Sequence, residues 1–541
     1  MNEEKRRRID PLKIVFALGY VLQGIANPFQ GITYQPFIAH LSKYYGLGEG
    51  AAQSFFAKSY LAWSFKPLIG FLIDAYGRTR TLLIGLLATA TLGFLATPLL
   101  ERGPLSFFGL MFAVSVVMAA SDVAVDRATV IAGDEESKAT GRPRATTVGL
   151  NQAICWLAIY GSGTLAAVLG GYATDHVSFK QLFLVLAAVP LLMLLFVLRL
   201  PRDTAVPIPV ARSIAQFWAG LNSGSILPIM LFFFLIHFQP QFGPIFITYM
   251  TTKLHFSQAQ FGFANGAAYV GYFAGVLLFI WRGVRWQERL GLRKLFRIYI
   301  VVGAAVTLTQ FVLLDPWFSA VSGAVSRWLP FVSSGVARMG LLCLDMALVA
   351  ACNQLIWMST YSLVGAIVPV GAAGSLFAGF MSVANLGFTF SAMSGSWLYD
   401  RGMALAPLRG LQNSLFGIGG GPGDKLAIHM LVLLAGLAYF ASFLVVHLVP
   451  GRDATLASGG PAIVGPERWR VLSAGLRRAV NGGALLGGVT LLAWLAWRWR
   501  DDPLTVVAWA LATFLGVCLV RESMLDALLR RRSNVEPRAP S

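Results

Sequence analysis

Residues 63–80 read W-S-F-K-P-L-I-G-F-L-I-D-A-Y-G-R-T-R, and this stretch decides the fold. It places Lys66 and Asp74 in one apolar helix, which ends at a short basic turn before a second apolar helix starts at Thr81. A lysine inside a membrane helix costs roughly 2.5–3.5 kcal/mol on insertion scales, so such a residue has a partner or a task. The stretch therefore predicts two membrane helices joined by a tight turn, with a paired or functional charge on the first.

The composition is that of a membrane protein with many spans. The 541 residues are 56% hydrophobic and 13% charged, whereas a soluble domain is about 25% charged. The net charge of +18 could indicate nucleic acid, but Lys and Arg collect in the cytoplasmic loops of any such membrane protein. We therefore expect the lipid bilayer as a partner, and no nucleic acid.

Apolar runs indicate twelve spans followed by two more, in an all-α polytopic protein. They lie near 13–41, 50–75, 79–100, 104–131, 144–173, 178–199, 223–250, 257–281, 294–314, 336–364, 368–398, 425–449, 482–498 and 503–521. Lys and Arg are concentrated in the alternate loops that include the N-terminal one, which predicts both termini in the cytoplasm. The basic start M-N-E-E-K-R-R-R has no cleavage site after it and indicates a signal-anchor. Together with the Ala/Gly/Leu/Arg-rich composition, it favours a bacterial inner membrane.

Proline and charge at 201–222 mark a cytoplasmic linker, which divides the chain. We expect a six-helix half at 1–200 and a second at 223–450. A Gly/Pro-rich and then basic tether at 451–481 leads to a two-helix appendage with a basic tail at 482–541. The appendage has no intramembrane charge to pair with the twelve helices, so we expect it to be dispensable for the core.

Ionisable residues within the spans are few and point to function. The candidates are Lys58, Lys66, Asp74, Asp122, Asp126, His237 and Asp345. Asp122 and Asp126 stand four apart, so they share one helix face and repel each other unless a cation intervenes. Lys66 or Arg127 is the natural cation. The cluster serves either as a structural clamp between helices 2 and 4 or in substrate binding and proton movement, and both readings stay open.

Polar residues in the first span form a stripe. Gln23, Asn27, Gln30 and Tyr34 step by four, three and four residues, which is the spacing of a single helical face. Such a stripe suits a cavity for a planar heterocycle, although amide bonds between helices would also use it. His237 could carry a coupling proton. Four further amides are candidates for the lining of the second half: Asn265, Asn353, Gln354 and Asn385.

The motifs resemble known transporters. G-F-L-I-D-A-Y-G-R-T-R resembles the signature that major facilitator transporters carry between their second and third helices, through Gly70, Asp74, Gly77, Arg78 and Arg80. The longer W-x-x-K-P-L-x-G-F-L-x-D form, S-D-V-A-V-D at 121–126 and L-F-A-x-x-M-S-x-x-N-L-G within 374–387 are similar to the folate-biopterin transporter family. The resemblance implies the major facilitator fold, with two six-helix halves that rock about a midplane site. It also implies that the 70–80 turn is a conformational switch, in which Asp74 faces the N-terminus of a helix from the other half.

One departure from that family lies near Pro369. The family pattern has an arginine, a cysteine before the proline and a glutamate four residues after it. This chain has Ala366, Val368 and Ala373 at those places. The two charges were lost either as a paired bridge, which leaves no orphaned charge, or because the substrate differs.

The function that these features predict is secondary transport. We expect a monomeric, proton-coupled symporter for a folate- or pterin-like solute or another small anionic organic molecule. A muropeptide-permease type of substrate is the alternative, because those permeases have a related D-x-x-x-D in helix 4. No GxxxxGK[ST] loop is present, which argues against ATP drive within this chain.

Neither an enzyme activity nor a cofactor or metal site is expected. Asp122 and Asp126 are faintly similar to the acidic motif of prenyltransferases, but that chemistry needs a second acidic cluster, and the second half has only Asp345 within its spans. No Ser-His-Asp or HExxH pattern is visible. Four cysteines lie in apolar runs without metal-ligand spacing, namely Cys155, Cys343, Cys352 and Cys518.

Overall fold

The computed structural model of the protein describes residues 11–28, 30–59, 61–141, 144–199, 209–221, 226–367, 373–449, 474–498 and 502–535. Across these ranges the chain is helical, with no strand. The basic start, most of the tether and the residues Val368 and Pro369 of the motif departure lie outside them.

Within the described ranges, the first half and the linker contain ten α-helices and one short π-helix. They are α1 (Pro11–Ala26), α2 (Tyr34–Ala39), η2 (His40–Tyr44), α3 (Glu49–Ser59), α4 (Leu61–Ser64), α5 (Lys66–Tyr76), α6 (Thr79–Leu100), α7 (Pro104–Thr140), α8 (Arg144–His176), α9 (Phe179–Val197) and the linker helix α10 (Val210–Leu221).

The second half and the appendage are also built from helices within their described residues. They comprise α11 (Ile226–His237), α12 (Gly243–Thr248), η3 (Tyr249–Lys253), α13 (Gln258–Leu278), η4 (Phe279–Gly283), α14 (Val284–Leu290), α15 (Leu292–Thr309), η5 (Gln310–Leu313), α16 (Trp317–Trp328), α17 (Ser334–Ile367), α18 (Ala373–Arg401), η7 (Gly402–Ala404), α19 (Ala406–Phe416), α20 (Ile428–Ala438), η8 (Tyr439–Leu444), η9 (Val446–Leu448), α23 (Ala474–Arg498) and α24 (Pro503–Val535).

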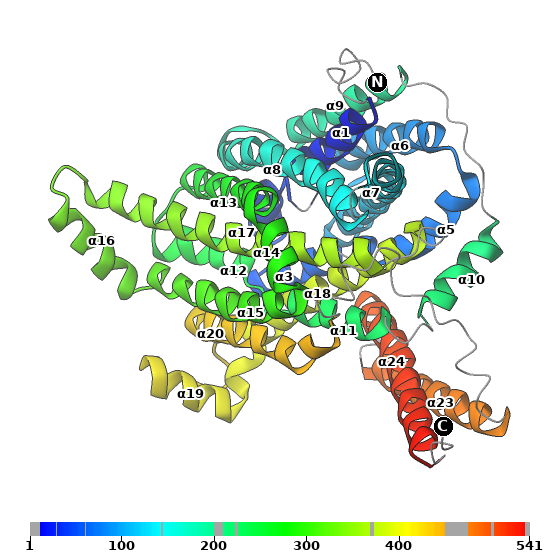
Figure 1. Ribbon diagram of the computed structural model, residues 1–541. Coiled ribbons are helices and arrows are strands. Elements are labelled where there is room, and N and C mark those ends of the chain that lie inside the picture. Colours follow the sequence, from blue (N-terminus) through cyan, green and yellow to red (C-terminus); the bar gives the residue numbers. More distant parts are fainter. Residues whose placement is uncertain are drawn as a thin grey trace.

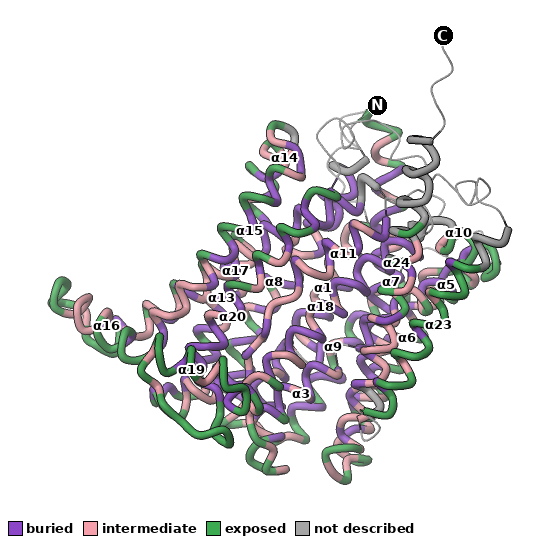
Figure 2. Tube along the Cα trace, turned by 90° about the horizontal axis from the view of Figure 1, so that it is seen from below, coloured by how far each residue is buried: buried purple, intermediate pink, exposed green. Residues whose placement is uncertain are grey.

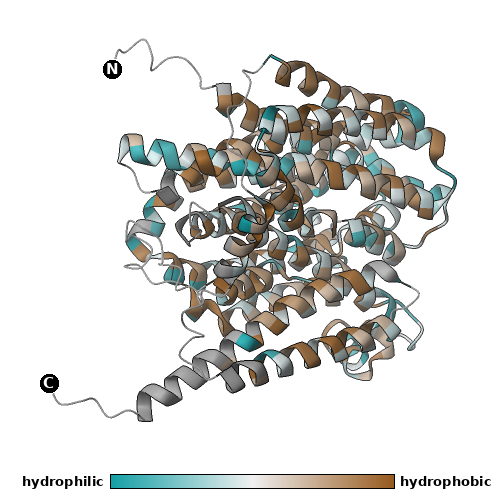
Figure 3. Ribbon diagram, turned by 90° about the vertical axis from the view of Figure 1, so that its right-hand side faces the viewer, coloured by the Kyte–Doolittle hydropathy of each residue, from teal (hydrophilic) through white to brown (hydrophobic). Residues whose placement is uncertain are grey.

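The predicted spans correspond to these helices. Within the described residues, nine helices are long and apolar enough to cross a membrane, and Figure 3 shows hydrophobic residues along them. The first, second, seventh and twelfth predicted spans are each built from shorter pieces, so the exact number of spans stays a prediction. Helices α16 and α19 in the long loops of the second half were not anticipated.

Prolines explain three of the breaks. Pro28 follows α1, Pro67 stands at the start of α5, and Pro240 lies between α11 and α12. Proline has no backbone N–H and clashes with the preceding helical turn, so a helix stops or restarts there. In transporters, such discontinuous helices supply the substrate site. All three breaks lie next to residues of the central cavity described below.

The two halves meet along two seams. In Figure 1, α1, α6, α7 and α9 gather at the upper right, and α15, α17 and α20 lie below and to the left. One seam joins α8 to α13, where Gly171 and Gly262 touch: a Cβ on Gly171 would lie 2.7 Å from the Cα of Gly262. The other seam joins α3 to α18, where Ser396 Oγ donates to the Gly50 carbonyl at 2.8 Å. Figure 2 shows the buried residues concentrated in the middle of the bundle and the exposed ones towards its rim.

The appendage is a helical hairpin that contacts both halves. Helices α23 and α24 lie side by side, and α24 packs against α11 and α18. Phe390 and Trp509 pack edge to face with ring centroids 4.7 Å apart. Contrary to our expectation, the appendage also has a charged partner in the bundle. Asp502, directly before α24, pairs with Lys58 of α3 at 2.8 Å.

Candidate functional site

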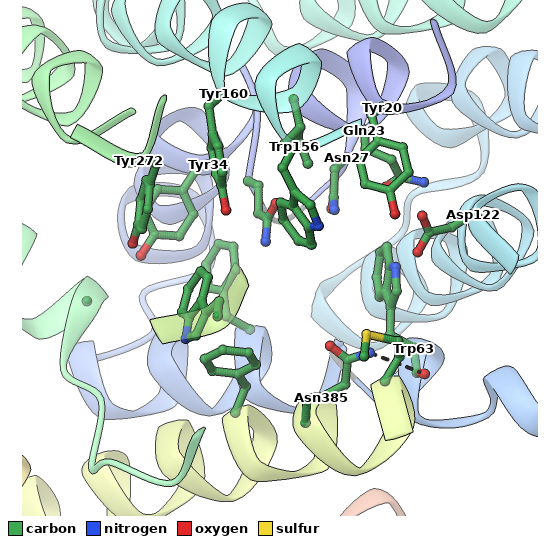
Figure 4. A pocket seen from close by; sticks show the side chains of 18 of the residues that line it. Tyr20, Gln23, Asn27, Tyr34, Trp63, Asp122, Trp156, Tyr160, Tyr272 and Asn385 are labelled. Carbon is green, nitrogen blue, oxygen red and sulfur yellow. Dashed lines mark hydrogen bonds between the residues drawn. The ribbon is translucent and has the colours of Figure 1, made fainter. Parts of the chain in front are cut away.

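A cavity of about 330 Å³ lies between the halves, where the broken helices meet. Figure 4 shows side chains from both halves pointing into it. Its polar lining consists of Tyr20, Gln23, Asn27, Gln30, Tyr34, Gln53, Lys66, Asp122, Asp126, Gln152, Gln241, Asn265 and Asn385. Its aromatic lining adds Phe56, Trp63, Trp156, Tyr160, Tyr269, Tyr272, Trp357, Tyr361 and Phe388.

Three of the predicted intramembrane charges meet in this cavity. Lys66 Nζ lies 2.5 Å from Asp122 Oδ2 and 3.6 Å from Asp126 Oδ2. All three residues are buried, with 4%, 8% and 5% of their surface exposed. Removing either partner of such a buried pair leaves an uncompensated charge, which is strongly unfavourable. The ion pairs therefore hold the start of α5 against the middle of α7.

Hydrogen bonds from two more helices stabilise one of the carboxylates. Tyr20 of α1 donates its hydroxyl to Asp126 Oδ1 at 2.7 Å. Gln152 of α8 donates to the same oxygen at 3.2 Å and to Thr129 Oγ1 at 2.8 Å. Asp126 is thus the acid at which α1, α5, α7 and α8 converge, and one lysine beside two carboxylates leaves the cluster one negative charge in excess.

Arg127 has a different partner from the one considered in the sequence. Its Nε lies 2.7 Å from Asp74 Oδ1, so it does not compensate the two cavity carboxylates. Ser213, in the first turn of the linker helix α10, donates to Asp74 Oδ2 at 3.1 Å. The described partners of Asp74 therefore come from α7 and from the linker.

The rest of the 70–80 motif shapes the turn. Gly77 ends α5 with a φ of +68°, a left-handed conformation that glycine adopts without strain. Arg80 donates to the carbonyl of Leu198 at 2.8 Å, which ties the turn to the last residues before the linker. Arg78 is exposed, and Gly70 is buried in α5.

The polar stripe of the first span, which we call the amide stripe after its three amides, lines the cavity. All four of its members, Gln23, Asn27, Gln30 and Tyr34, belong to the wall. Part of the stripe also serves packing, because Gln23 donates to the Met118 carbonyl at 3.1 Å. From the other half, Asn385 of α18 donates to the carbonyl of Trp63 at 3.5 Å, a contact drawn in Figure 4.

A stack of aromatic rings, which was not predicted from the sequence, crosses the cavity. Tyr361 stacks on Trp156 at 5.2 Å with the planes 12° apart, and Trp156 stacks on Tyr160 at 5.5 Å. Tyr160 continues to Tyr272 at 4.9 Å and 18°, and Tyr272 to Trp357 at 5.7 Å and 17°. Aromatic residues three or four apart on α8, α13 and α17 were the signal that could have revealed this set.

A comparison of the sequence with protein-family profiles matches the BT1 family over residues 23–455. The chain belongs to the BT1 family. It is 24% identical over 445 residues to the probable folate-biopterin transporter 4 of Arabidopsis thaliana, which covers 68% of this chain and 84% of that one. It is 25% identical over 445 residues to the folate-biopterin transporter of Synechocystis, with 80% and 81% covered. The hairpin of α23 and α24 lies beyond the matched region.

The fold comparison confirms the predicted architecture. The structure superposes on the D-xylose-proton symporter with a TM-score of 0.53 at 15% identity, covering 82% of this chain and 98% of the symporter. At this identity the likeness shows the fold alone. This BT1 protein is therefore an integral membrane transporter with the major facilitator fold, and its three family motifs fall on α4–α5, α7 and α18.

Two predicted pathway residues lie outside the cavity. His237 is buried in α11, where Nδ1 lies 2.7 Å from the Phe233 carbonyl oxygen, and Trp357 and Phe388 contact its ring. Asp345 of α17 accepts a hydrogen bond from Thr309 of α15 at 2.6 Å. Their roles in the pathway stay predictions.

Two further predicted amides have tyrosine partners. Gln354 accepts from Tyr160 at 2.6 Å, and Asn353 accepts from Tyr439 at 2.6 Å. Gln354 thereby joins the two halves beside the aromatic stack. Among the described residues, no group of three or more His, Cys, Asp or Glu side chains could hold a metal ion.

Proposed function

We propose that this BT1 protein is a proton-coupled symporter that moves a pterin- or folate-like solute by alternating access. The observation that carries the proposal is the cavity itself, in which an aromatic stack, an amide stripe and a buried charge cluster face one another. The names of the two relatives describe folate-biopterin transport. The cavity chemistry supports the same solute class.

The walls suit a flat, nitrogen-rich ring. Aromatic side chains bind planar rings by offset stacking, and side-chain amides offer both donors and acceptors to such a ring. The indole Nε1 of Trp156 is buried and has no hydrogen-bond partner among the described residues. A substrate acceptor placed beside Trp156 would satisfy this donor. The volume is near the lower end of the roughly 300–1,000 Å³ typical of ligand pockets, which favours a small solute over a muropeptide.

The charge cluster supplies a site for the coupling proton. A proton taken up by Asp126 would cancel the excess negative charge and free Lys66 to pair with Asp122 alone. Because Asp126 and Arg127 are neighbours on α7, and Asp74 and Lys66 lie on α5, a change at the cluster would reach the Asp74–Arg127 pair. Helix α5 also packs against α18 of the other half. Proton binding would in this way shift the contact between the halves.

The charges of the cavity also bear on the substrate's charge. Among the described lining residues Lys66 is the only basic one, and both of its ion pairs are to carboxylates of the same wall. No cation of this wall remains for a substrate carboxylate. We therefore favour an uncharged pterin over the anionic solute that the sequence suggested.

Uptake into membrane vesicles tests the proposal. Vesicles that contain the protein should accumulate labelled biopterin when an inward proton gradient is imposed, and a protonophore should abolish the accumulation. Asp126→Asn should abolish accumulation but retain exchange. Glu135→Gln, an exposed acid on the same helix, should behave as the wild type. Vesicles that take up neither biopterin nor folate above the level of empty vesicles would refute the proposal.

A further inference from the structure

A second cavity, of about 770 Å³, opens on the outer surface of the second half. It lies where α15 passes η8, so it belongs to the flank of the bundle and not to the seam between the halves. Its lining consists of Leu290, Gly291, Arg293, Lys294, Arg297, Ile298, Val301, Val302 and Phe443. We call it the flank groove.

The floor of the flank groove is one face of α15. Lys294, Arg297, Ile298, Val301 and Val302 follow the i, i+3, i+4, i+7, i+8 spacing of a single helical face, and all five are exposed. The opposite face, which includes Phe296 and Ile300, is fully buried. Along the helix axis this exposed face changes character: its first turns carry the basic side chains, and the following turns are apolar. Figure 2 shows α15 at the edge of the bundle.

The charged end of the groove is entirely basic. Three of its nine lining residues are basic and none is acidic. Arg293 donates its Nε to the Val449 carbonyl at 2.7 Å, which fixes it at the end of the twelfth predicted span. Within the described part of the chain, no carboxylate forms an ion pair with Lys294 or Arg297. Two neighbouring cations thus face outward at the top of an apolar trough.

The position along the helix matches the depth of a lipid headgroup. Lys294 and Arg297 lie in the first six residues of α15, and Arg285 and Arg289 of the preceding α14 are exposed nearby in sequence. Such a concentration of Lys and Arg marks the cytoplasmic side of a membrane protein. On this side, basic pockets between transmembrane helices bind the headgroups of anionic lipids. The apolar residues one and two turns further along α15 would lie at the level of the acyl chains.

We propose that the flank groove binds one anionic phospholipid of the cytoplasmic leaflet. The lipid phosphate would pair with Lys294 and Arg297, and an acyl chain would lie along Ile298, Val301 and Val302 against Phe443. Charge complementarity selects this occupant, because a zwitterionic headgroup brings a cation to a basic site, and a free phosphate leaves the apolar trough empty. The bound lipid would join α15 to η8. This site is independent of the proposed solute.

The test uses the purified full-length protein and two lipids with the same short acyl chains, phosphatidylglycerol and phosphatidylcholine. Native mass spectrometry measures the lipid that stays bound at each concentration. The double variant Lys294→Gln/Arg297→Gln should lower the affinity for phosphatidylglycerol about thirtyfold, since each basic residue near an anionic lipid contributes to binding. Arg285→Gln/Arg289→Gln removes the same charge outside the groove and should change the affinity less than threefold.

A second variant and a soluble probe distinguish the contribution of the apolar trough to lipid binding from that of the basic end. Val301→Ser should lower the affinity for both lipids to a similar extent and preserve the preference for phosphatidylglycerol. Glycerol phosphate, which has the headgroup charge without the chains, should compete poorly. The proposal is overturned if the two double variants behave alike, if the wild type does not prefer phosphatidylglycerol, or if glycerol phosphate competes at similar concentrations. Binding of neither lipid would also overturn it.

Discussion

Lys66 Nζ lies 2.5 Å from Asp122 Oδ2, and this contact fixes the start of α5 to the middle of α7 inside the central cavity. Eight residues further along α5, Asp74 pairs with Arg127 of α7 at 2.7 Å. The same two helices are therefore joined at two levels, and the second ion pair includes the acid of the 70–80 motif. Protonation of an acid in the Lys66 cluster could therefore be transmitted through α5 and α7 to the Asp74–Arg127 pair.

Two matched double variants should distinguish a coupling site from a structural clamp. Lys66→Met alone should lower expression and thermal stability, since removing one partner of a buried pair costs about 3–5 kcal/mol. Adding either Asp122→Asn or Asp126→Asn should restore much of that loss. Lys66→Met/Asp122→Asn keeps Asp126 with its bonds from Tyr20 and Gln152, so it should still accumulate solute in a pH-dependent way. Lys66→Met/Asp126→Asn should exchange solute without accumulating it.

Both double variants remove the lysine and one carboxylate, so a structural clamp predicts the same behaviour for both. A proton-coupling site at Asp126 predicts that they differ. If both accumulate solute with the wild-type pH dependence, the proton passes elsewhere and His237 is the next candidate. Uptake by vesicles at several external pH values, with protein amount measured in parallel, gives the comparison.

The indole N–H of Trp156, which has no hydrogen-bond partner among the described residues, should contribute to substrate binding. Trp156→Phe keeps an aromatic ring in the stack but removes the donor, so we expect the KM for biopterin to rise about tenfold, as for the loss of one hydrogen bond. Trp156→Ala should cost more, because it also removes the stacking partner of Tyr361 and Tyr160. Trp281→Phe, at an exposed tryptophan, is the control. An unchanged KM for Trp156→Phe would argue against substrate contact.

The cavity should discriminate against a carboxylate tail. Folate carries the pterin ring and a negatively charged glutamate tail, whereas biopterin is uncharged at neutral pH. Because Lys66 already pairs with two carboxylates, a substrate carboxylate would enter a wall of excess negative charge. We expect unlabelled folate to compete with labelled biopterin at least tenfold less well than biopterin itself. Equal competition would mean that the tail is bound outside the described lining.

The sequence indicated Lys66 or Arg127 as the cation beside Asp122 and Asp126, because intramembrane charges are rare and two acids four apart share a helix face. It could not assign Arg127, since spacing alone does not say which carboxylate an arginine reaches. The aromatic stack was not visible, because Trp and Tyr are ordinary in apolar helices. Rings such as Tyr160 and Tyr272 meet only when α8 and α13 pack across the seam. Proline positions could have indicated the helix breaks that bring the cavity walls together.

Asp74→Asn should fold but transport poorly. The substitution removes the charge opposite Arg127 while retaining an acceptor for Ser213. We expect a shifted balance between the inward- and outward-facing states, measured as changed labelling of single cysteines placed in the cavity wall. Ser213→Ala removes only a neutral donor, a loss of about 1 kcal/mol, and should have the smaller effect. Unchanged uptake and labelling in Asp74→Asn would count against a switch at this residue.

The hairpin of α23 and α24 should be dispensable for transport but not for stability. A chain ended near Gly451 should insert and take up solute, because the family match ends at residue 455. It should melt at a lower temperature in detergent, since an aromatic pair such as Phe390–Trp509 contributes about 0.5–1.5 kcal/mol. Phe390→Leu in the full chain should reproduce part of this loss. A truncated chain that fails to fold would show that the hairpin is integral to the bundle.

The Lys58–Asp502 contact should hold the hairpin in place equally at about pH 5 and about pH 7. Burial opposes the ionised form of Asp502, but hydrogen bonds from Lys58 and Thr505 and the charge of Lys58 outweigh it, so the pKa of Asp502 lies below its usual value. A carboxylate with a lowered pKa contributes stability above its unfolded pKa of about 3.9 and loses it as the pH falls through the lower folded value. Cross-linking between Leu61→Cys and Ala508→Cys, two residues buried in one cluster, should therefore be equal at about pH 5 and pH 7. Adding Lys58→Met should reduce cross-linking at both pH values, and a loss confined to pH 5 in the wild type would contradict the assignment.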